Sequence, residues 1–191
     1  MTVEINCCIN QTERTLVQSC VGKTLTSLQG VMLGNAAWHT VRVETDGPTF
    51  DITCLQTSQP IDDRGGTDEY GVIHVNRARP GSLEVPDIAG DADQMPIGQT
   101  IDAAYIANDE IATYSHSTLA CNRRSTQAII FKLANGMHLA IDRGVWFSEM
   151  LVISEGTSIE NLLYDGSQDW EDDPLEDPGT HYEFRSWIEA V

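Results

Sequence analysis

Basic residues are scarce in this sequence. Its 191 residues include 11 lysines and arginines against 29 aspartates and glutamates, so the formal net charge at pH 7 is −18. Non-specific binding to DNA or RNA needs a basic patch that neutralises phosphates, and this composition excludes it. Docking on an anionic membrane surface is disfavoured for the same reason. The charge instead favours a partner with a basic surface, because complementary charge speeds encounter.

Long apolar runs are also lacking. No stretch approaches the roughly 20 apolar residues that a membrane-spanning helix needs. The first residues, MTVEINCCINQTER, lack the basic start and apolar core of a signal peptide. The five cysteines are odd in number and show no CxxC spacing. We therefore expect a cytoplasmic protein that keeps its cysteines as reduced thiols and makes no contact with a membrane.

Catalytic and metal-binding motifs are not recognisable in the sequence. There is no GxSxG motif, no cysteine lies in a recognisable catalytic context, and the Cys7-Cys8 pair has no nearby basic residue that would lower a thiol pKa. The five histidines show neither HExxH nor HxH spacing, and the acidic run Asp169–Asp173 lacks the glycine and final glutamate of a calcium loop. The sequence thus predicts no cofactor and no metal site, and it favours a binding protein over an enzyme.

The clearest structural pattern is the segment Gln127–Ser154, in which two apolar runs flank the turn signal Asn135-Gly136. A three-residue loop, Ala134–Gly136, places six apolar side chains on one face, with Leu133 facing Met137, Phe131 facing Leu139 and Ile129 facing Ile141. A two-residue loop would put Lys132 opposite Leu139 and break this face, so the three-residue loop is favoured. A further apolar run, Glu149–Ile153, predicts a third strand.

Alternation of apolar and polar residues predicts more strands at Val3–Ile9, in a hairpin at Thr40–Leu55 with Val43 opposite Phe50, and at Tyr70–Val75. Two polar stretches, Gln56–Glu69 and Tyr114–Gln127, predict loops, and the second would carry Arg123-Arg124 as a solvated basic pair. Apolar residues at helical spacing predict helices at Thr157–Tyr164 and His181–Val191.

Together these patterns predict a β-rich α+β fold of antiparallel hairpin and meander sheets, with helices mainly at the C-terminus. Gly22-Lys23-Thr24-Leu25 is echoed by Gly98-Gln99-Thr100-Ile101, which suggests duplicated halves, 1–80 and 96–155, joined by a connector at 76–96. A β-meander without duplication would show the same echo. We expect one compact domain over residues 1–191, with an acidic C-terminal segment at 154–191. The layout is similar to that of small β-rich bacterial proteins, including inhibitors of toxins.

The acidic C-terminal segment is where we expect a partner to bind. It holds a single base, Arg185, and interleaves acids with aromatic residues, as tight protein interfaces do. A core role for these aromatics is the alternative. The sequence therefore predicts an intracellular inhibitor, such as a bacterial immunity protein that neutralises a basic toxin or nuclease. Its predicted partner-binding site consists of Asp169, Trp170, Glu171, Asp172, Asp173, Glu176 and Asp177.

Two other functions stay open. One is an enzyme with a small-molecule or metal site in a cleft between two β halves, rimmed by His39, His138, Asp142 or Trp146. The other is a nucleic-acid mimic, in which spaced carboxylates imitate phosphates. Acids that cluster near the C-terminus among aromatic residues fit a local docking site better than a regular array.

Charge reversal tests the predicted partner site. Asp172→Lys combined with Asp173→Lys should slow association with a basic partner more than it speeds dissociation, because surface charge mainly sets the encounter rate. Binding kinetics with the product of the neighbouring gene would measure both rates. An unchanged association rate would mean that these acids serve solubility alone.

Overall fold

The computed structural model describes residues 2–60, 66–81, 83, 92–167 and 179–191. These residues form strands connected by short turns, and a single α-helix lies among them. The elements are β1 (Val3–Cys7), α1 (Gln11–Gln18), β2 (Thr24–Gly30), β3 (Met32–Leu33), β4 (Ala36–Trp38), β5 (Thr40–Thr45), β6 (Phe50–Pro60), β7 (Thr67–Arg77), β8 (Asp93–Ser115), β9 (Thr118–Leu133), β10 (His138–Asp142), β11 (Met150–Gly156), the 3₁₀ turn η1 (Ile159–Asn161) and β12 (Thr180–Ala190).

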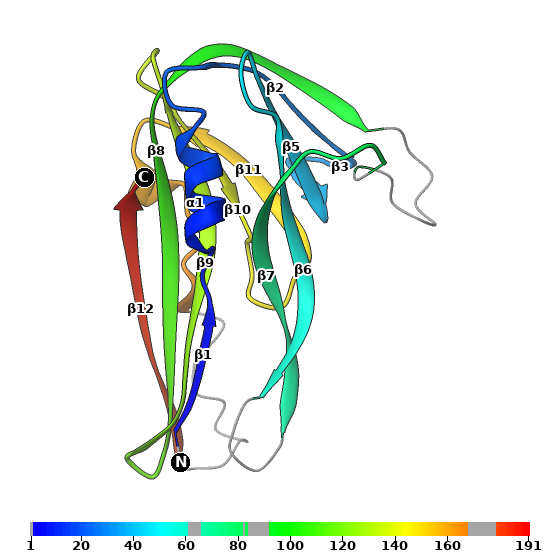
Figure 1. Cartoon of the computed structure of the whole chain (residues 1–191). Helices are drawn as coiled ribbons and strands as arrows, with labels where there is room; N and C mark the ends of the chain where they lie inside the picture. Colours follow the sequence, from blue (N-terminus) through cyan, green and yellow to red (C-terminus); the bar gives the residue numbers. More distant parts are fainter. Residues whose placement is uncertain (1, 61–65, 82, 84–91, 168–178) are drawn as a thin grey trace.

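The strands follow the order β3-β4-β11-β10-β9-β8-β2-β5-β6-β7, with β1 parallel to β9 and β12 antiparallel to β8. Strand β8 contributes to both parts of this strand order. Up to Thr100 it pairs with β2, and from Ile101 it pairs with β9. The layer of β2, β5, β6 and β7 consequently faces the layer of β8 to β12 (Figure 1). The prediction of a β-rich antiparallel fold is confirmed.

The core lies between these two layers. Its fully buried side chains come from both of them, for example Phe50 and Ile52 on β6 and Phe131 and Ile141 on β9 and β10. Each such side chain contributes roughly 1.5–3 kcal/mol through burial. The apolar residues whose alternation identified the strands in the sequence therefore form the surfaces by which the two layers face each other.

Both hairpin registers predicted from the sequence are confirmed. Phe131 pairs with Leu139 and Ile129 with Ile141, while the amide of Leu133 donates to the carbonyl of Met137 at 2.8 Å. Gly136 has a φ of 83°, the left-handed conformation that the three-residue loop requires. In the other hairpin, Val43 pairs with Phe50 and Val41 with Ile52. The third strand expected at Glu149–Ile153 is β11.

The two predicted loops are wrong where the structure describes them. Residues 56–60 and 67–69 extend the β6–β7 ladder, with Ser58 opposite Glu69. Residues 118–127 belong to β9, which turns back from β8 at His116 and Ser117. Most residues at this end of the β6–β7 ladder are exposed, and β9 turns polar residues such as Arg123 and Ser125 into the interior. An alternation of apolar and polar residues therefore does not identify either segment as a strand.

The predicted C-terminal helices are also wrong. Residues 180–190 form strand β12, and only the short turn η1 lies within Thr157–Tyr164. In β12, Tyr182 and Phe184 pack against a buried cluster while Glu183 and Arg185 are exposed, which is the period of a strand. The α-helix of this fold lies near the N-terminus instead. The duplicated halves and the connector at 76–96 stay predictions.

Helix α1 begins at a complete capping box. The Asn10 side chain accepts from the amides of Thr12 and Glu13, and the Glu13 carboxylate accepts from the amide of Asn10 at 2.7 Å. The other Glu13 oxygen accepts from the amide of Val75 on β7 at 3.0 Å. Glu13 therefore gives a backbone amide of β7 a hydrogen-bond acceptor. Helix α1 covers one side of the two layers (Figure 1). No helix among the described residues is long and apolar enough to cross a membrane.

Candidate functional site

The partner site predicted from the sequence falls outside the described residues. Asp169, Trp170, Glu171, Asp172, Asp173, Glu176 and Asp177 all belong to the interval 168–178. The described chain resumes at Gly179 and enters β12 directly. This part of the prediction therefore stays a prediction.

The four residues proposed to rim an enzyme cleft have different surroundings. The Nε2 atom of His39 lies 3.0 Å from a Glu149 carboxylate oxygen. His138 lies next to Tyr105, with ring centroids 6.4 Å apart. Asp142 is buried and accepts hydrogen bonds from the amides of Gly144 and Tyr164 at 2.6 and 2.9 Å. Trp146 is fully buried against Tyr70 in an edge-to-face contact.

A buried polar cluster holds the loop that carries Trp146. Arg143 donates from Nη2 to Asp109 at 3.1 Å and from Nη1 to Ser125 at 2.9 Å, and its guanidinium lies 4.1 Å from the Trp146 ring centroid. The Arg143 and Asp109 side chains are 0% and 1% exposed. Burial raises the pKa of Asp109 to about 7, against the opposing effect of Arg143. This cluster is closed to solvent, so its role is in stability.

Arg123 and Arg124 are adjacent in sequence, and their side chains point to opposite faces of β9. Alternation along β9 turns Arg123 into the interior, where its guanidinium lies 3.5 Å from the Tyr70 ring centroid and donates to Gln59 at 3.1 Å. Arg124 faces outward and pairs with Glu110 at 2.8 Å. The predicted solvated basic pair is therefore wrong for Arg123, which is 3% exposed.

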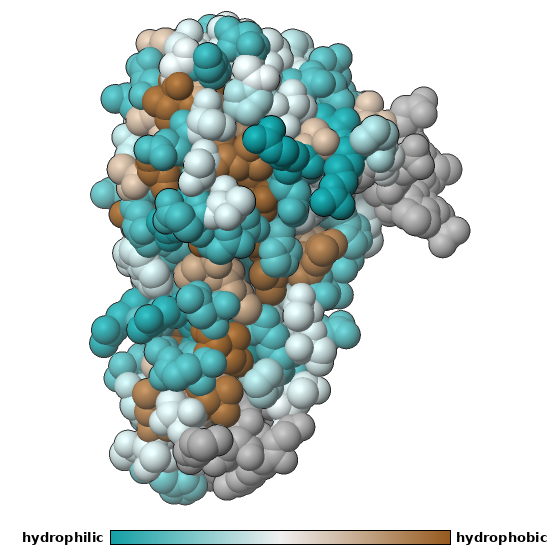
Figure 2. All heavy atoms as spheres, in the orientation of Figure 1, coloured by the Kyte–Doolittle hydropathy of each residue, from teal (hydrophilic) through white to brown (hydrophobic). Residues whose placement is uncertain are grey.

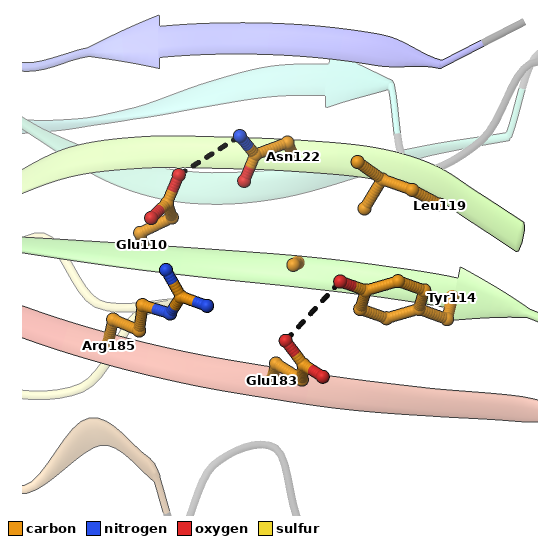
Figure 3. Close-up of a pocket in the computed structure, with 7 residues that line it drawn as sticks. Glu110, Tyr114, Leu119, Asn122, Glu183 and Arg185 are labelled. Carbon is orange, nitrogen blue, oxygen red and sulfur yellow. Dashed lines mark hydrogen bonds between the residues drawn. The ribbon is translucent and has the colours of Figure 1, made fainter. Parts of the chain in front are cut away.

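A hollow among the described residues lies on the outer face of β8, β9 and β12. It is a shallow groove of about 120 Å³, and Figure 3 shows the labelled side chains that line it. Residues two apart along each strand share this face, which is why β8 contributes Glu110, Ala112 and Tyr114 while Asp109 points inward. The full lining is Glu110, Ala112, Tyr114, Leu119, Asn122, Glu183 and Arg185.

Hydrogen bonds hold the two carboxylates of this outer groove. Glu110 accepts from Asn122 at 3.0 Å and from Arg124 at 2.8 Å. Burial acts to raise the pKa of Glu110, but these donors hold it below its ordinary value. Glu183 accepts from the Tyr114 hydroxyl at 3.3 Å, and the Tyr114 ring stacks on His181 with centroids 4.7 Å apart. The groove therefore places two carboxylates and the Arg185 guanidinium beside an aromatic ring.

Acids also dominate the exposed surface beyond the groove. Arginines 14, 42, 124 and 143 are engaged in ion pairs with Glu189, Asp51, Glu110 and Asp109. Hydrophilic side chains cover most of the face shown in Figure 2, with apolar patches between them. The exposed acids that form no ion pair with a base in the described residues are Glu4, Asp46, Asp68, Glu69, Asp93, Asp102, Glu155, Glu160, Asp165 and Glu183.

The described residues contain no group of three or more histidine, cysteine, aspartate or glutamate side chains placed to hold an ion. The chemistry that the outer groove offers is hydrogen bonding and charge attraction to a cationic side chain. Its members were not identified from the sequence, although Glu110, Ala112 and Tyr114 on one segment and Glu183 and Arg185 on another stand two residues apart, as residues on one face of a strand do.

Comparisons of this chain with protein-family models, with curated proteins and with solved structures find no match.

Proposed function

We propose that this chain is an inhibitor that binds a basic protein, as a bacterial immunity protein neutralises a toxin such as a nuclease. The observation that supports the proposal is the set of exposed acids that form no ion pair within the described ranges, in a chain whose net charge is −18. Such a surface attracts a basic partner over distances near the Debye length, about 8 Å at physiological salt.

The outer groove is the place where this attraction becomes a specific contact. Tyr114 and Leu119 offer an apolar wall, and Glu110 and Glu183 offer carboxylates (Figure 3). A lysine or arginine side chain of the partner would lay its apolar stem on the wall and place its charge beside the Glu183 carboxylate, since Arg185 of this chain already lies between Glu183 and Glu110 (Figure 3). Aromatic anchors with surrounding charge are typical of tight interfaces.

A pair of matched charge reversals tests this docking site. Glu183→Lys, in the groove, and Glu160→Lys, on η1, change the net charge equally and both replace exposed acids. With the neighbouring gene's product as partner, Glu183→Lys should weaken binding about tenfold or more, through loss of a close charge contact. Glu160→Lys should change only the long-range attraction and weaken binding much less.

The salt dependence of binding separates the long-range charge attraction from the close contact in the groove. Raising the salt concentration should slow association of wild type and of both variants, since exposed charges are screened. Loss of the partner's toxic or nuclease activity in the presence of this chain would establish inhibition. Equal effects of the two reversals would place the docking site elsewhere, and failure of wild type to bind or inhibit the partner would refute the proposal.

A further inference from the structure

Two neighbouring rows of side chains cross the sheet at the outer groove. Residues directly opposite one another on paired strands share a face, so the pairing of β1, β9, β8 and β12 fixes both rows. One row consists of Glu4, Asn122, Ala112 and Glu183. The next consists of Asn6, Arg124, Glu110 and Arg185. The short side chain of Ala112 leaves room among longer neighbours, and the groove therefore lies where these rows meet.

Arg185 is a cation of this groove without a counter-ion in the described part of the chain. Its cross-strand neighbour Glu110 pairs instead with Arg124, at 2.8 Å. The ion pairs formed between described residues do not include Arg185, whose side chain is exposed. Figure 3 shows it between Glu183 and Glu110. Its fork of N–H donors is therefore available to a group that enters the groove.

Asn122 contributes an acceptor to the same groove. It is 8% exposed, and its Nδ2 atom donates to Glu110 at 3.0 Å and to Glu4 at 3.2 Å. Carboxylates accept hydrogen bonds and do not donate them when ionised, so they engage only the Nδ2 end of the amide. The buried Oδ1 atom has no hydrogen-bond partner among the described residues. A donor that reaches this oxygen would remove the cost of leaving a buried acceptor unpaired.

The charges of the groove favour a ligand group that carries both signs. A lone cation at Glu183 would also meet the Arg185 guanidinium, which repels it. A lone anion at Arg185 would approach against the net charge of −18. A cation and a carboxylate held side by side satisfy the whole groove, with the cation donating to Glu183 and to Asn122 Oδ1. The carboxylate then accepts from Arg185, whose guanidinium matches it in a bidentate pair.

We propose that the outer groove recognises a cation and a carboxylate side by side on the surface of the basic partner, and that Arg185 selects the carboxylate. The inference rests on the proposed function, because it describes how a basic protein docks in that groove. A lysine or arginine near an aspartate or glutamate on one helix face presents such a pair. A surface with bases alone would meet Arg185 as a repulsive neighbour, so this residue makes the groove selective among basic proteins.

Charge reversal of Arg185 tests the proposal through the sign of its effect. Arg185→Glu makes the chain more acidic, so general attraction to a basic partner would strengthen binding. If Arg185 holds a carboxylate of the partner, the reversal should instead raise the Kd for the neighbouring gene's product about tenfold or more. Arg77→Glu is the matched control, because it makes the same charge change at an exposed base that ends β7. It should leave the Kd unchanged or lower it.

Reversal of the partner's own acids completes the test. Among partner variants with one surface aspartate or glutamate changed to arginine, one should restore tight binding to Arg185→Glu. Isothermal titration calorimetry would measure each Kd, and circular dichroism would establish that every variant is folded. If Arg185→Glu binds as tightly as Arg77→Glu, or if no partner reversal restores its affinity, the proposal is overturned while the proposed inhibition stands. A wild type that does not bind the partner would overturn the proposed function, and this inference with it.

Discussion

Replacing Arg143 by methionine is expected to lower the free energy of unfolding by about 3–5 kcal/mol at pH 8. The Arg143 side chain is fully buried, and its guanidinium bonds Asp109 at 3.1 Å and Ser125 at 2.9 Å. Methionine fills much of the same volume but leaves the Asp109 carboxylate buried without its cation. Urea unfolding followed by tryptophan fluorescence would measure the loss.

Two further variants test whether the loss of stability comes from the unpaired buried charge. Arg143→Met combined with Asp109→Leu removes both charges and should recover a large part of the lost stability, because no ionised group then remains unpaired. Arg185→Met removes an exposed arginine on β12 and should change stability by no more than about 0.5 kcal/mol. A loss below about 1 kcal/mol for Arg143→Met would show that the ion pair is not what holds this cluster.

The hairpins could be predicted from sequence because their information is local. Asn135-Gly136 specifies the turn, and the alternation on either side specifies which residues face the core, so the pairing of Phe131 with Leu139 follows. The same holds for Val43 and Phe50, which flank Asp46-Gly47. In both cases a shift of one residue would expose apolar side chains, and the sequence therefore leaves one register.

Strand β12 could not be predicted in this way. The run His181–Val191 carries large apolar residues at 182, 184, 187, 188 and 191, which satisfy helical spacing as well as alternation. What decides its state is β8, which offers an edge to pair with from Tyr105 to Ser115. That edge is remote in sequence, so the choice is made by tertiary structure.

The buried polar cluster escaped prediction for a related reason. Asp109, Ser125 and Arg143 are distant in sequence, and each is of a residue type that usually faces solvent. They lie together because β8 carries Asp109, β9 carries Ser125, and the Arg143 guanidinium that follows β10 reaches both and also donates to the carbonyl of Gly71 on β7 at 3.3 Å. The outer groove has the same origin, since it draws on three strands that only the fold aligns.

Burial of two carboxyl groups gives the protein an unusual dependence on pH. Burial raises the pKa of Asp109 to about 7 and that of Asp142 to about 6, from an ordinary value of 3.8. Both groups therefore hold a proton more tightly in the folded chain than in the unfolded chain. Their stabilising contribution is complete below about pH 4 and is lost as the pH rises through the folded pKa values.

The free energy of unfolding attributable to these groups should therefore fall between about pH 4 and pH 7, with the part between pH 6 and 7 coming from Asp109. At about 1.4 kcal/mol per pKa unit, the Asp109 contribution is on the order of 4 kcal/mol. Urea unfolding at intervals of pH would measure the slope. Asp109→Asn removes the titrating group and should flatten the profile between pH 6 and 7, while the Asp142 contribution at lower pH remains. The same slope in wild type and Asp109→Asn would show that Asp109 is already ionised throughout this range, held so by Arg143.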